Sequence, residues 1–144
     1  MTKEETTKLL SLLTAYYGRQ NTDAETTVNA WWLLLRDYNY KIAEQAVLEY
    51  VKADKREYSQ FPKVGVIIKS IEDEEKAFIV IRNYALYGRE YEGLPERSKK
   101  WISKERYARL KKCPEEYLLE NIEQIKATLS RNLLPERSNK NGNI

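Results

Sequence analysis

The residues with the clearest chemical potential are the basic ones between Arg97 and Lys112, where eight lysines and arginines accompany a single acid. Trp101 and Tyr107 lie among them. Such a segment can follow a phosphate backbone while its aromatic rings stack on bases. It can also meet an acidic protein surface, where positive charge accelerates encounter, or form a solvated helix face without a partner. The sequence leaves all three open, but no recognised DNA-reading fold favours nucleic acid.

The sequence offers little to an enzyme. It contains no histidine, the side chain best suited to acid-base work near neutral pH, and Cys113 is its only cysteine. It contains neither a P-loop nor a GxGxxG motif. Paired glutamates such as Glu74 and Glu75 fall at predicted helix starts, where the helix dipole explains them. We therefore predict a protein that binds a partner and has no catalytic, cofactor-binding or metal-binding residue.

The N-terminal residues MTKEETTKLL are charged and polar, unlike a signal peptide. No apolar run approaches the ~20 residues that a membrane span needs. We expect a cytoplasmic protein that contacts no membrane.

Helical signals follow one another through the N-terminal half. Thr2 and Glu5 form a capping-box pattern that opens a helix, and Gly18 is placed to end it. Thr22 and Glu25 repeat the pattern before a second helix, and a third follows the turn near Asn39. The predicted apolar faces are Val28, Trp31, Trp32, Leu34, Leu35 and Tyr38 in the second helix, and Ile42, Ala43, Ala46, Val47, Tyr50 and Val51 in the third.

The stretch SQFPKVGVIIKSI, residues 59–71, is compatible with a strand because it is rich in β-branched residues. A lone strand among helices would have no partner, so we predict a helix that starts near Pro62. Phe61 should plug its entrance, and Val64, Ile68 and Ile71 should face inward. The helical spacing continues through Phe78 and Tyr84 and breaks at Tyr87 and Gly88.

These patterns predict an all-α protein. Residues 1–87 should form a bundle of about four helices, residues 88–133 a basic and amphipathic helical arm, and residues 134–144 a disordered tail. Within the arm, one basic helix is expected from about Lys99 to Lys112 and another from Pro114. The apolar residues of the last helix are spaced four, three and four apart, the seam that one helix offers to another.

Three segments in order resemble the bacteriophage replicative helicase loader and inhibitor family: MTKEETTKLLSLLTAYY, TTVNAWWLLLRDYNYKIAEQAVLEYV and FPKVGVIIKSI. In that family a helix with Trp and a terminal Asp-Tyr precedes a tyrosine-led helix, and FPPT or FPPS opens a fourth. This sequence carries Lys63 and Val64 where the family has its second Pro and its Thr or Ser cap. The matching positions are Trp31 or Trp32, Asp37, Tyr38, Tyr40, Phe61 and Pro62.

The resemblance implies an all-helical N-terminal domain and a C-terminal region that contacts a DnaB-like hexameric replicative helicase. It also implies a non-enzymatic protein of the host cytoplasm that brings the helicase to the phage origin. There it holds the helicase inactive until an origin-binding replisome organiser, a possible second partner, releases it. The candidate helicase contacts are Trp101, Arg106, Arg109, Leu118, Ile122, Ile125 and Leu129.

Two other functions remain open. A DNA-binding replication or regulatory protein would rely on residues 97–112, and its affinity would fall steeply with salt. An inhibitor of a host replication protein, such as the host's own loader, would keep the fold and change the target.

Overall fold

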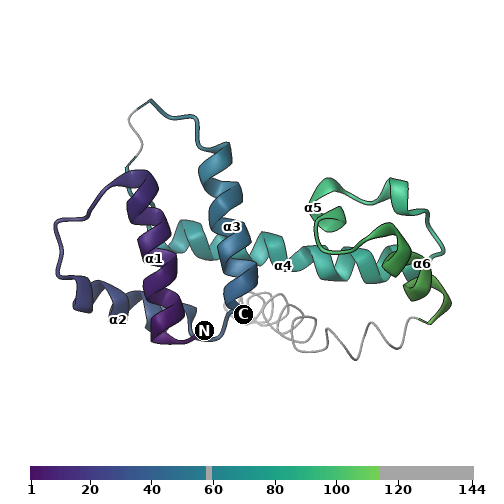
Figure 1. The fold of residues 1–144 in the computed structure, drawn as a ribbon, viewed down its shortest axis with the longest axis horizontal. Helices are drawn as coiled ribbons and strands as arrows, with labels where there is room; N and C mark the ends of the chain where they lie inside the picture. The colour runs from purple at the N-terminus through teal and green to yellow at the C-terminus, as the bar shows by residue number, and fades with distance from the viewer. Residues whose placement is uncertain (58–59, 114–144) are drawn as a thin grey trace, which may run out of the picture. The chain divides into compact units, whose positions relative to one another are not determined.

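The computed structural model describes residues 1–57 and 60–113, and every regular element in this part of the chain is helical (Figure 1). The all-α prediction is therefore confirmed. The elements are α1 (Lys3–Tyr17), α2 (Ala24–Leu35), α3 (Tyr40–Ala53), α4 (Val64–Leu86), the short 3-10 helix η1 (Tyr91–Gly93), α5 (Glu96–Lys99) and α6 (Lys104–Lys112).

The chain divides into two compact units, Met1–Glu74 and Glu75–Ile144. Helix α4 contributes its first half to unit 1 and its second half to unit 2. The functional division into residues 1–87, 88–133 and 134–144 stays a prediction. The expected helix from Pro114 and the expected tail lie outside the described residues.

Helix α1 has the predicted ends. The Thr2 hydroxyl oxygen accepts from the Glu5 backbone N–H at 3.1 Å, and the Glu5 carboxylate accepts from the Thr2 N–H at 2.9 Å. This capping box satisfies two N–H groups that the helix itself leaves unpaired. At the other end, Gly18 has φ 84° and donates its N–H to the Thr14 carbonyl, so a residue that tolerates positive φ stops the helix.

Helix α2 begins one residue later than the Thr22 prediction requires. Asp23 is the N-cap, and its carboxylate accepts from the Thr26 N–H at 3.1 Å and from the Thr26 hydroxyl at 2.8 Å. These two hydrogen bonds hold the pKa of Asp23 below its ordinary value. The sequence contains two adjacent N-cap residue types, and the charged acceptor takes the position.

The buried face of α2 is narrower than predicted. Trp31 and Leu35 are buried, whereas Leu34 and its neighbour Leu33 are 53% and 58% exposed. Trp32 is half-buried and donates its indole N–H to the Met1 carbonyl at 3.1 Å. Including Leu34 in the apolar face was therefore wrong.

Helix α3 follows its predicted period. The Asn39 side-chain oxygen caps it by accepting from the Lys41 and Ile42 N–H groups at 3.0 and 3.3 Å. Its buried residues are Ile42, Ala43, Ala46 and Val47.

Residues 64–71 are helical, as predicted, but α4 starts at Val64 and its inward face is rotated. Ile67 and Ile71, one turn apart, are fully buried, whereas Val64 and Ile68 are half-buried. The prediction of Ile68 as an inward residue was therefore wrong.

The α4 helix ends in a Schellman arrangement at the predicted break. Gly88, at φ 65°, donates to the Ala85 carbonyl, and Arg89 donates to the Tyr84 carbonyl at 2.9 Å.

In unit 2 the second half of α4 carries one side of a small core. Ala77, Phe78, Ile81 and Ala85 are buried there, together with Leu94, Ser98, Ile102, Tyr107 and Leu110. The continuous basic helix predicted from Lys99 to Lys112 is wrong, because α5 ends at Lys99 and α6 starts at Lys104. Ser103 makes the break by capping α6, its hydroxyl oxygen accepting from the Arg106 N–H at 3.2 Å.

Candidate partner-binding surfaces

The basic segment of residues 97–112 is built into the core of unit 2. Tyr107 is 1% exposed and donates its hydroxyl to the Arg89 carbonyl at 2.6 Å. Trp101 is half-buried, with its ring centroid 5.1 Å from that of Phe78. The Ser98 hydroxyl donates to the Ala77 carbonyl at 3.3 Å. Tyr107 is thus unavailable for stacking on a base, which removes one of the two aromatic side chains that supported a nucleic-acid interpretation.

Acidic residues from the preceding loop and from α5 offset part of the basic charge. Lys104 pairs with Glu92 at 2.8 Å, and this hydrogen bond raises the pKa of Lys104 and lowers that of Glu92. Two further pairs are Lys111 with Glu90 and Lys99 with Glu96, each at 3.5 Å. Exposed pairs of this kind contribute little to stability. Their main effect is on the distribution of charge, since they offset three of the eight positive charges.

The remaining charge includes a row on the outer side of α6. Arg106, Arg109 and Lys112 are exposed and spaced three residues apart, so they are neighbours on the helix surface. Tyr107 and Leu110 anchor the opposite, buried side. We call Arg106, Arg109 and Lys112 the basic face of α6. Two predicted contacts, Arg106 and Arg109, lie on it, and Trp101 packs against Phe78; Leu118, Ile122, Ile125 and Leu129 lie outside the described residues.

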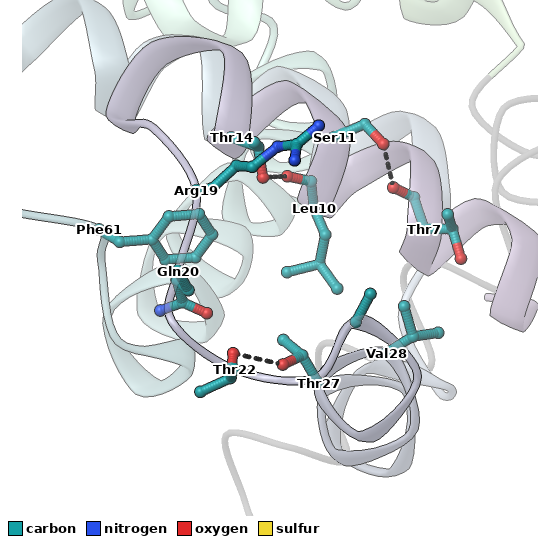
Figure 2. Close-up of a pocket in the computed structure, with 11 residues that line it drawn as sticks. Thr7, Leu10, Ser11, Thr14, Arg19, Gln20, Thr22, Thr27, Val28 and Phe61 are labelled. Atoms are coloured by element: carbon teal, nitrogen blue, oxygen red, sulfur yellow. Dashed lines mark hydrogen bonds between the residues drawn. The ribbon is translucent and has the colours of Figure 1, made fainter.

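Unit 1 has a groove of about 520 Å³ between α1, the start of α2 and Phe61 (Figure 2). Its floor is apolar, with Leu10, Val28 and Phe61, and Arg19 and Gln20 lie at one end. The remaining lining residues are mostly hydroxyl-bearing: Thr7, Ser11, Thr14, Thr22 and Thr27, with Ala24. We call this the threonine groove.

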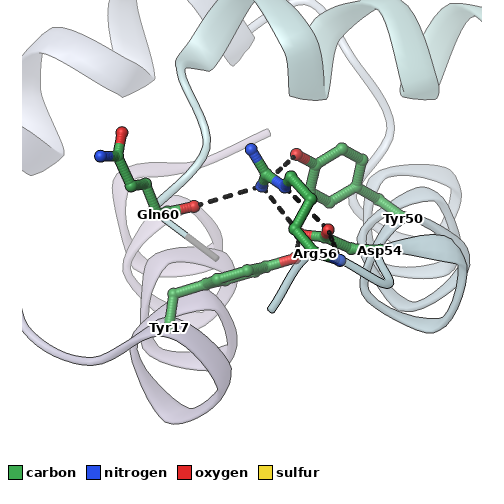
Figure 3. Close-up of polar contacts among 5 residues, drawn as sticks. All are labelled: Tyr17, Tyr50, Asp54, Arg56 and Gln60. Carbon is green, nitrogen blue, oxygen red and sulfur yellow. Dashed lines mark hydrogen bonds and ion pairs between the residues drawn. The ribbon is translucent and has the colours of Figure 1, made fainter. Parts of the chain in front are cut away.

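A polar cluster beside this groove holds the segment that carries Phe61 (Figure 3). Tyr17, at the end of α1, donates its hydroxyl to the Asp54 carboxylate at 2.8 Å. Arg56 makes two charged hydrogen bonds to the same carboxylate, both 2.8 Å, and reaches the Tyr50 hydroxyl at 3.3 Å and the Gln60 carbonyl at 3.5 Å. These contacts tie residues 54–60 to α1 and α3.

Phe61 continues this anchoring with aromatic contacts. Its ring lies edge-on to Trp31 at 6.1 Å and to Tyr17 at 6.5 Å between centroids. Edge-to-face pairs at this separation are favourable beyond their burial. The expectation that Phe61 plugs the entrance of α4 is therefore confirmed, and Asp54 and Arg56 are the partners that the sequence did not reveal.

The Asp54 carboxylate should make unit 1 sensitive to acid. Its side chain is 6% exposed, and hydrogen bonds from Arg56, then from Tyr17, hold its pKa well below the ordinary value. A lowered folded-state pKa stabilises the fold above the unfolded-state value of about 3.9 and loses that contribution as pH falls. Asp54→Asn should therefore unfold at lower urea concentration than the wild type at pH 7. The gap should shrink below about pH 4, and a gap independent of pH would contradict this assignment.

Tyr17 should contribute the opposite dependence. Burial, and then the hydrogen bond to Asp54, raises the pKa of Tyr17 to about 12. A raised folded-state pKa gives stability that is complete below the unfolded-state value of about 10 and is lost as pH rises toward 12. Urea midpoints between pH 9 and pH 12 should fall for the wild type and change less for Tyr17→Phe. Equal slopes for the two proteins would refute this role of the hydroxyl.

Sequence reasoning missed the threonine groove. The one available signal was the spacing of Thr7, Ser11 and Thr14, which places three hydroxyls along one face of α1. Arg19 and Gln20 follow the helix without any pattern of their own.

Two searches limited to the described residues gave no further site. No helix there is long and apolar enough to cross a membrane. No cluster of at least three cysteine, aspartate or glutamate side chains in that part of the chain is arranged to hold a metal ion.

Comparison with known proteins gives one match. Residues 1–68 match the family model for the N-terminal domain of the phage SPP1 gene 39 protein. No curated protein and no solved structure matches the chain. The matched range contains the threonine groove and the Tyr17–Asp54–Arg56 cluster, and it ends inside α4. Through residues 1–68, this chain belongs to the family of that phage protein, the replicative helicase loader and inhibitor family, which is non-catalytic.

Proposed function

We propose that this protein binds a hexameric replicative helicase, keeps it inactive and delivers it to a phage replication origin. The observation that carries the proposal is the match of residues 1–68 to the N-terminal domain of the loader family, which makes the chain a helicase loader-related replication protein. The residues that would contact the helicase are a separate question, because unit 2 lies beyond the matched range.

We place the helicase contact in residues 88–133, with the basic face of α6 as its described part. Arg106 and Arg109 are exposed on a helix whose other side is anchored by Tyr107 and Leu110, so they are presented on a fixed backbone. Arginine suits an interface of this kind because its planar guanidinium binds carboxylates through two hydrogen bonds at once. An acidic surface on the helicase is the complementary partner.

The same geometry supports a protein partner better than DNA. Tyr107 is buried, and Trp101 packs against Phe78. Three exposed basic residues would give a log-log salt slope of only about −3 on duplex DNA, which is characteristic of a weak contact.

A strand-unwinding assay tests the inhibitory part of the proposal. The helicase encoded by the phage or its host, a forked DNA and ATP would be mixed with increasing amounts of the full chain. Unwinding should fall as the complex saturates, and an added replisome organiser should restore it on origin DNA. Full unwinding by a saturated complex would contradict inhibition.

A further inference from the structure

We propose that the threonine groove of unit 1 binds an extended acidic peptide from a protein partner, with an apolar side chain on its floor. The site lies within residues 1–68, apart from the basic face of α6, and the inference does not depend on the proposed helicase contact.

The hydroxyl groups of the groove are acceptors because their hydrogens are already used. On α1, Thr7, Ser11 and Thr14 donate to the carbonyls four residues earlier at 2.8 to 2.9 Å. Across the groove, Thr27 donates to the Asp23 carbonyl at 2.9 Å, so its contact with Thr22, also 2.9 Å, takes the Thr22 hydrogen. Each oxygen keeps at least one lone pair for an incoming donor.

A row of acceptors calls for a ligand with a row of donors. An extended peptide backbone presents N–H groups at regular intervals, whereas a nucleic-acid backbone presents phosphate oxygens, which only accept. An α-helix is also a poor fit, because its interior N–H groups are satisfied within the helix. Figure 2 shows the hydroxyls of Thr7 and Ser11 on one wall and the Thr22–Thr27 pair on the other, separated by the open groove.

The groove selects for an apolar side chain and a negative charge. Leu10, Val28 and Phe61 form the apolar part of the lining, in a volume within the range of ligand pockets. Arg19 is the only ionisable residue among the eleven that line it, and in the described part of the chain it makes no ion pair. An acidic residue beside an apolar one therefore matches both features.

Synthetic peptides can test this with the full-length protein. The probe is the blocked peptide Ac-Asp-Leu-Glu-Leu-NH2, titrated into 15N-labelled protein and followed by amide chemical shifts. Shifts should concentrate at the threonine groove, including Thr7, Ser11 and Thr27, with a dissociation constant on the order of 1 mM. Shifts spread over other surfaces, or none at several millimolar peptide, would overturn the proposal.

Two matched peptides separate the contributions. Ac-Asn-Leu-Gln-Leu-NH2 removes the charge and should bind about threefold more weakly. The acidic peptide with N-methylated leucines removes two N–H donors and should also bind more weakly, because the hydroxyl acceptors then have no partner. If both bind as well as the parent peptide, neither recognition element is correct.

Arg19→Glu supplies the matched protein variant. It should reverse the preference, so that Ac-Lys-Leu-Lys-Leu-NH2 binds better than the acidic peptide. Lys69→Glu makes the same change in charge at an exposed residue outside the groove lining and should leave the order unchanged. An unchanged order in Arg19→Glu would overturn the assignment of Arg19.

Discussion

The double variant Arg106→Glu/Arg109→Glu should bind the replicative helicase at least about tenfold more weakly than the wild type, a loss of about 1.4 kcal/mol or more. Both side chains are exposed on α6, so the substitutions remove no buried packing. They replace two positive charges by two negative ones, which repel an acidic partner. Affinity would be measured by biolayer interferometry on immobilised helicase at low and physiological salt.

A control variant distinguishes this surface from a general effect of charge. Lys41→Glu/Lys69→Glu makes the same change in net charge at two exposed residues of unit 1. It should retain wild-type affinity apart from a small loss at low salt, where long-range attraction is greatest. If the two double variants bind equally well, the basic face of α6 is not the contact.

Tyr107→Ala should unfold unit 2 at neutral pH. The ring is 1% exposed, and its centroid lies 5.9 Å from that of Tyr91. Removing a buried aromatic side chain costs about 3 to 5 kcal/mol, a large share of the stability of a small unit. Hydrogen exchange followed by NMR should show lost protection in α6 and retained protection in α1 and α3.

The conservative variant Tyr107→Phe separates packing from the hydrogen bond. It keeps the ring and removes only the hydroxyl that donates to the Arg89 carbonyl at 2.6 Å. The expected loss is about 1 kcal/mol, with α6 still protected. Protection of α6 in Tyr107→Ala equal to that of the wild type would show that unit 2 does not depend on this side chain.

Local signals in the sequence predicted much of unit 1. The Thr2–Glu5 capping box and Gly18 involve residues close in sequence, so their effect is readable without the fold. The four buried residues of α3 were predicted by helical periodicity alone.

Choices between nearly equal local options were less predictable. Thr22 and Asp23 are both good N-cap residues, and Ile67 and Ile68 differ by one position in a run of apolar residues. Only packing against other elements decides which isoleucine points inward. Ser103 was overlooked as a cap because the surrounding residues are so strongly basic.

The threonine groove and the Asp54 cluster could not be predicted because they depend on distant residues. Tyr17 and Asp54 are 37 residues apart, and the groove joins α1 to residues of α2 and to Phe61. The acidic partners of the basic segment lie closer, in Glu90, Glu92 and Glu96, but their pairing needed the turn at η1 and α5.

Direct measurement of the complex is the sharpest test of the central claim that this protein binds a hexameric replicative helicase. The full chain and the purified phage or host helicase would be mixed at micromolar concentrations with ATP, and particle masses would be determined by mass photometry. We predict a helicase species heavier than the hexamer by whole copies of this chain, and less of that species with Arg106→Glu/Arg109→Glu. Masses of the unliganded hexamer alone, with both the phage and the host helicase, would contradict the account.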